Sequence, residues 1–94
     1  MIRPTFAPGD RVYVKADAQN GTNYGYRRLR INSTVSRNAW PLDIGYRDLV
    51  KLSGPVYGLA IAVVVVKCPE PIQFVLVLSE VGLLWHPSGG LALW

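Results

Sequence analysis

The sequence predicts a small all-β protein, and three observations support this class. Residues 11–15 alternate apolar and polar side chains with the period of a strand. The longest apolar run, residues 59–66, ends in four consecutive valines, and β-branched residues favour strands. No stretch of ten or more residues repeats apolar positions at helical spacing. With 94 residues, the chain is expected to form one domain.

The front half predicts an extended arm followed by short strands. Residues 1–9 contain two prolines and form the arm. The strand at 11–15 places Val12 and Val14 on one face. A polar loop is expected at 17–25, with Asn20-Gly21 as a tight turn, and a second strand at 26–32, with Leu29 and Ile31 pointing inward. Residues 46–49 suggest a single helical turn and 50–52 a strand, so that 10–52 forms the barrel-like part.

The back half predicts a long hydrophobic hairpin, residues 56–85, after a boundary at Ser53-Gly54-Pro55. Residues 56–67 are apolar on both faces of a strand. Residues 72–84 are expected to be its antiparallel partner, across the rigid turn Pro69-Glu70-Pro71. A tail, residues 86–94, contains a loop at 87–90 and ends at Trp94.

The composition is unusually apolar for a chain of this size. Half of the residues are hydrophobic and 17% are charged, against about 25% in a typical soluble domain. Either the strands are buried on both faces, or a partner or a second copy of the chain covers the excess. We expect the second arrangement, with the hairpin and residues 91–94 forming much of the contact surface.

The residues that carry catalysis or metal binding are scarce. His86 is the single histidine and Cys68 the single cysteine, so a zinc site or an internal disulfide is not expected. His86 is interpreted as a surface or packing residue and Cys68 as a small apolar one. We therefore expect a non-enzymatic protein without a cofactor. The apolar run of eight residues is shorter than the about 20 of a membrane-spanning helix, and residues 1–10 do not suggest a signal peptide.

Positive charge is concentrated in residues 1–51, which hold nine of the ten Lys and Arg residues. Tyrosines and arginines interleave over residues 24–30, and we expect Arg11, Tyr13 and Lys15 to lie on an adjacent strand. This cluster fits a protein interface, a solvated face or a nucleic-acid site, and the sequence leaves the three open. The residues predicted to bind a partner are Tyr13, Tyr24, Tyr26, Arg28, Arg30, Val64, Trp85 and Trp94.

Two segments resemble a known group of folds. Residues 6–14, Phe-Ala-Pro-Gly-Asp-Arg-Val-Tyr-Val, look like the first strand of SH3-like small barrels, including KOW-type modules. Residues 46–52, Tyr-Arg-Asp-Leu-Val-Lys-Leu, resemble their helical turn and last strand. The Gly-x-x-Gly turn that usually follows the first KOW strand is absent, which weakens the nucleic-acid role that the KOW resemblance would imply.

The resemblance implies a small SH3-like barrel, to which the hairpin and extended termini are additions. Barrels of this kind are similar to neck and capsid cement or decoration proteins of tailed phages. On that basis we expect a structural protein that docks on capsid or neck proteins and forms a homo-oligomer. Its expected location is the virion, or the cytoplasm if the protein is not viral; the alternative is a nucleic-acid-binding module.

Overall fold

The computed structural model describes residues 5–16, 22–30, 46–67 and 71–94. These residues form seven strands and two short 3₁₀ turns. The strands are β1 (Arg11–Val14), β2 (Thr22–Tyr26), β3 (Leu49–Ser53), β4 (Val56–Lys67), β5 (Pro71–Ser79), β6 (Gly82–Pro87) and β7 (Leu91–Leu93), and the turns are η1 (Tyr46–Asp48) and η2 (Ser88–Gly90).

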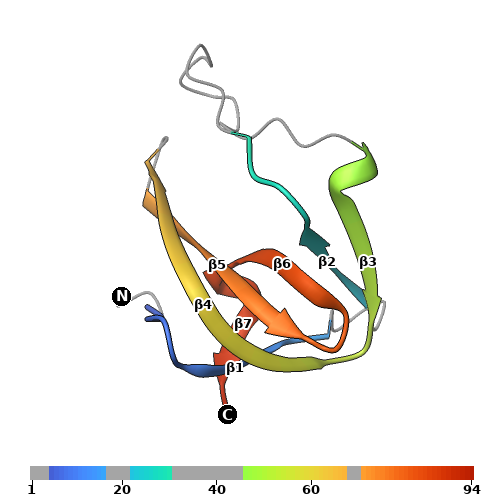
Figure 1. Cartoon of the computed structure of the whole chain (residues 1–94), viewed down its shortest axis with the longest axis horizontal. Coiled ribbons are helices and arrows are strands. Elements are labelled where there is room, and N and C mark those ends of the chain that lie inside the picture. The colour runs from blue at the N-terminus through green and yellow to red at the C-terminus, as the bar shows by residue number, and fades with distance from the viewer. Residues whose placement is uncertain (1–4, 17–21, 31–45, 68–70) are drawn as a thin grey trace.

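All seven strands belong to one antiparallel sheet, in the order β3-β2-β6-β5-β4-β1-β7. The sheet coils into a half-barrel, around which the long β4 curves (Figure 1). The predicted all-β class is therefore confirmed. The β4–β5 hairpin lies within this sheet, because β4 also pairs with β1 and β5 also pairs with β6.

The pairing of β4 with β5 was predicted correctly, and β4 has the predicted bounds. Its register places Leu59 opposite Leu78 and Val63 opposite Val75. A bulge between Ala60 and Ala62 interrupts the ladder. Bulges bend a strand and increase its twist, so this one contributes to the coiling of β4.

The bent part of β4 also brings the two backbones unusually close. A Cβ atom on Gly58 would lie 2.5 Å from the backbone oxygen of Leu78 and 2.7 Å from Cγ1 of Val77. Neither separation is compatible with a side chain unless the strands move apart. Glycine at this position therefore permits the close approach of β4 and β5.

One face of the sheet, the inner face, lines the concave side of the half-barrel and carries the core. Val12 and Val14 are fully buried there, as predicted from their alternation. Leu52 on the β3 side and Leu91 on β7 contribute to the same cluster, although these strands are at opposite edges of the sheet. Coiling thus brings both edges to one core, whose buried members are Phe6, Val12, Val14, Leu52, Val56, Ala60, Val75, Val77, Leu84 and Leu91.

Side-chain amides tie loops to this frame at two points. The Gln73 side chain accepts a hydrogen bond from the Phe6 amide at 2.8 Å and donates one to the Phe6 carbonyl at 3.0 Å. This reciprocal pair fixes the arm before β1 and allows Phe6 to enter the core. Asn23 Nδ2 on β2 donates to the Lys15 carbonyl after β1 at 2.8 Å, which links the two sides of the half-barrel.

The prediction for the second strand was wrong in its position. The strand begins at Thr22, within the predicted polar loop, and ends at Tyr26, where the predicted strand began. The Asn and Gly residues of this segment obscured its strand pattern, in which Tyr24 and Tyr26 lie on one face. Gly25 faces the interior, where an added Cβ would lie 2.8 Å from both Leu84 Cδ1 and His86 Cε1. Glycine here reflects close packing rather than a loop.

The predicted single strand over residues 72–84 is two strands. β5 ends at Ser79, Glu80 and Val81 form a turn, and β6 returns from Gly82 and pairs with β5. Gly82 has a φ of 99°, a conformation that most side chains avoid, and the Val81 amide donates to Ser79 Oγ at 3.2 Å. Ser79 and Glu80 therefore mark a hairpin turn rather than an interruption in one strand.

The remaining local predictions divide into two groups. The helical turn and strand at 46–52 are confirmed by η1 and β3, and the tail pairs with β1 as β7. The predictions for residues 1–4, Asn20-Gly21, Ile31, Cys68 and the start of the Pro69-Glu70-Pro71 turn lie outside the described residues.

Substitution of Gly58 by alanine should destabilise the fold by about 1–3 kcal/mol, because the added Cβ meets backbone rather than a movable side chain. Urea unfolding followed by circular dichroism measures the change. Gly89→Ala is the matched control, since a Cβ there would have no atom within 4 Å. Equal stability of Gly58→Ala and Gly89→Ala would contradict the close packing of β4 on β5.

Candidate functional site

The outer face of the sheet, on the side opposite the core, carries a row of exposed leucines. Leu59, Leu78 and Leu83 are direct neighbours across β4, β5 and β6. Their side chains are 40%, 47% and 51% exposed. Each occupies a position that alternates with buried inner-face residues, so the hydrophobic pattern continues on both sides of the sheet. Contiguous exposed apolar surface of this kind is typical of interaction sites.

An aromatic cluster extends the outer face toward β1 and β7. Tyr13 and Tyr57 are opposite each other in the register, with ring centroids 5.4 Å apart. The Trp94 ring meets Tyr57 edge-on at 5.3 Å, and Cζ of Arg11 lies 5.9 Å from the centre of the same indole. The Trp94 amide donates to the Arg11 carbonyl at 3.1 Å, which holds the end of the tail beside β1.

The other predicted aromatic and aliphatic site residues also lie on the outer face. Tyr26 pairs with Trp85 between β2 and β6, and Val64 pairs with Phe74 between β4 and β5. Tyr26 also contacts Phe74, with centroids 6.5 Å apart. The sequence analysis missed Tyr57 and the leucine row. Their alternation with Val56, Ala60, Val77 and Leu84 would have identified them, had the break between β5 and β6 been recognised.

The basic cluster of the front half is divided by the fold. Arg28 Nε and Arg30 Nη2 lie 3.2 Å and 3.4 Å from the two carboxylate oxygens of Asp48, which is only 3% exposed. These two contacts link the segment after β2 to η1, although both arginine side chains remain more than half exposed. The expectation that Arg11, Tyr13 and Lys15 lie on a strand adjacent to this cluster was wrong, because three strands, β6, β5 and β4, separate β1 from β2 in the sheet. The coiling nevertheless brings the end of β1 close to β2, where Asn23 Nδ2 donates to the Lys15 carbonyl.

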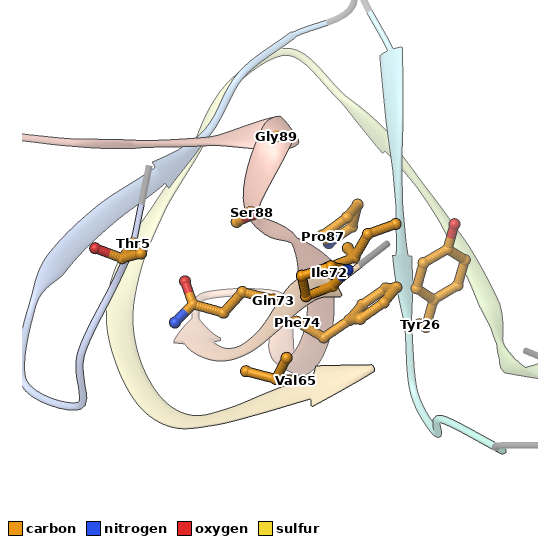
Figure 2. Close-up of a pocket in the computed structure, with 10 residues that line it drawn as sticks. Thr5, Tyr26, Val65, Ile72, Gln73, Phe74, Pro87, Ser88 and Gly89 are labelled. Carbon is orange, nitrogen blue, oxygen red and sulfur yellow. The ribbon is translucent and has the colours of Figure 1, made fainter. Parts of the chain in front are cut away.

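An apolar cavity of about 600 Å³ lies at the end of the sheet where Val65 and Gln73 pair. Figure 2 shows Ile72, Phe74 and Pro87 beside Tyr26 at this cavity, with Gln73 and Thr5 also on its wall. The volume is sufficient for an apolar side chain or a small ligand. The described wall has few polar groups, so the cavity is suited to binding an apolar group rather than to catalysis.

His86 is a packing residue within the inner face, as one of the two interpretations of the sequence proposed. It is 2% exposed, and none of the described residues forms a hydrogen bond with its Nδ1. Burial lowers the pKa of His86 from 6.5 to about 4, and a hydrogen bond with the backbone of Tyr24 offsets only part of this effect. The imidazole is therefore neutral and structural at physiological pH.

In the described ranges, no group of three or more His, Cys, Asp or Glu residues could hold a metal ion. No helix in those same ranges is long and apolar enough to cross a membrane. Comparison of the chain with protein-family models, with curated proteins and with solved structures finds no match. The function therefore has to be argued from the surfaces described above.

The buried His86 predicts a loss of stability on acidification. The unfolded chain binds a proton at His86 near pH 6.5, whereas the folded chain does so only near pH 4. Stability is thus highest above pH 6.5 and falls by about 3 kcal/mol as the pH drops to 4. Urea unfolding across this range measures the loss. His86→Leu should remove most of this dependence, and an unchanged dependence in that variant would contradict the assignment.

Proposed function

We propose that the chain is a non-enzymatic structural protein that docks, through its outer face, onto protein subunits of a larger assembly. The observation that carries the proposal is the row of Leu59, Leu78 and Leu83, flanked by the cluster of Tyr13, Tyr57 and Trp94. These side chains leave the outer face apolar on strands whose inner face already fills the core.

The character of this surface supports a protein partner. Aromatic residues and arginine are enriched at protein interfaces, and Arg11 stacks on Trp94 at the edge of the cluster. The rings are already held against one another and against β1, so little side-chain freedom is lost on binding. Paired strands and a pre-ordered aromatic cluster suit contact with another folded surface, including a further copy of this chain.

The kind of assembly is proposed from the resemblance to small barrels of phage particles. A capsid cement or neck protein would be short and would act by covering neighbouring subunits. Under this proposal the protein is located in the virion, and its neighbours are capsid or neck subunits or further copies of itself. A cytoplasmic assembly would use the same surface in the same way.

Paired substitutions on β5 test the docking surface. Leu78→Asp places a charge at the centre of the leucine row but leaves the core unchanged. We expect a folded protein whose association, with itself or with its assembly, is weakened at least about 100-fold, because an unpaired charge must be desolvated in the contact. Size-exclusion chromatography with light scattering measures self-association, and co-sedimentation measures binding to the assembly.

Val77→Asp, one position along, is the matched comparison. Val77 is 1% exposed in the core, so its replacement by aspartate should abolish the folded state measured by circular dichroism. The proposal fails if Leu78→Asp unfolds the chain as completely as Val77→Asp does. It also fails if the wild-type protein remains a soluble monomer that binds no larger assembly.

A further inference from the structure

A second cavity, of about 640 Å³, lies where β2, η1 and β3 meet, and it is lined by cationic and apolar side chains. The described residues of its wall are Tyr24, Arg27, Arg47, Leu49 and Lys51. Tyr24 and Lys51 are directly opposite each other in the β2–β3 ladder, and Arg27 follows β2 immediately. Among the described residues, the fold thus brings three positive charges and one aromatic ring together on one concave surface.

Within the described part of the chain, these three cations lack the acidic partner that the neighbouring arginines have. Asp48 accepts from Arg28 and Arg30, and its backbone carbonyl accepts from the Arg27 amide at 2.7 Å. Arg27 Nη1 donates to the Arg47 carbonyl at 2.9 Å, which brings the two basic residues together without neutralising either. Among the described residues, no carboxylate lies within ion-pair distance of Arg27, Arg47 or Lys51. Such a cluster attracts an anion from solution.

The apolar residues of the wall indicate which class of anion would fit the cavity. Tyr24 is 44% exposed and Leu49 is 39% exposed, so a flat apolar group could pack beside the cations. A nucleotide combines these two features, because its phosphate binds cations and its base stacks on an aromatic ring. An unpaired base is required, since the faces of bases in a duplex are already stacked. An acidic peptide would satisfy the charges but would not need the ring.

We propose that this cavity binds single-stranded nucleic acid, with a base on Tyr24 and phosphates at Arg27, Arg47 and Lys51. The site differs from the outer leucine row, which lies on β4, β5 and β6. Arg11 lies outside the site, because it stacks on Trp94 and three strands separate β1 from β2 in the sheet. Lys15 is closer to the site, since its carbonyl accepts a hydrogen bond from Asn23 Nδ2 on β2. The basic residues of the front half therefore do not act as one surface.

Fluorescence anisotropy with a labelled short oligothymidylate over a salt series tests the proposal. Three phosphate contacts predict a slope of log K against log salt of about −2, and Arg47→Gln or Lys51→Gln should each reduce the magnitude of that slope by about 0.7. Tyr24→Leu should weaken binding about tenfold with little change in slope, because stacking is lost while the charges remain. Arg11→Gln, which removes the same charge at the far end of β1, should leave binding nearly unchanged.

Three results would overturn the site. The first is the absence of binding at low salt by a protein that circular dichroism shows to be folded. The second is an equal loss in Arg11→Gln and Lys51→Gln, which would show attraction by net charge alone. The third is binding that is insensitive to Tyr24→Leu and is displaced equally by polyglutamate, which would identify an acidic protein surface as the ligand. None of these results depends on the leucine row, so the docking proposal is tested separately.

Discussion

The close approach of β4 to β5 at Gly58 is the constraint on which the rest of the structure depends. There the Leu78 oxygen lies where a side chain would otherwise be, and the bulge between Ala60 and Ala62 follows immediately. Together they coil the sheet, so that strands at its two edges share one core. A flat sheet of these strands could not enclose Val12 and Leu91 with Leu52. Within the described ranges, one coiled sheet thus encloses the core cluster on its own.

Among the described residues, no second layer covers the part of the outer face that carries the leucine row. Two-layer proteins bury the second face of an apolar sheet against a helix or another sheet. Here the described residues place Leu59, Leu78 and Leu83 in solvent, beside an ordered group of rings. Exposed apolar strands invite association, and a protein that retains them needs a defined partner. The fold and the proposed docking role therefore have one physical origin.

Sequence reasoning succeeded where periodicity was strong and failed where close packing determined the residue. Val12 and Val14 identified their strand, and the β-branched run predicted the bounds of β4. Gly25 was interpreted as part of a loop because a sequence does not reveal that His86 and Leu84 approach its Cα. Ser79 and Glu80 were interpreted as an interruption within one strand, because apolar residues continue on both sides of them. Neither the ion pairs of Asp48 nor the cavity beside Lys51 could be predicted, because both depend on strands brought together by the coiling.

Hydroxyl-radical footprinting of the wild-type protein over a concentration series, and in its native assembly, tests the central claim most directly. If the outer face is the docking surface, Leu78, Leu83 and Tyr57 should react readily in dilute protein, because they are exposed. They should become protected as the protein assembles. Thr5 and Val77 serve as references that remain reactive and unreactive, respectively. Full reactivity of the outer face in the assembled state would contradict the claim that this surface is the one that docks.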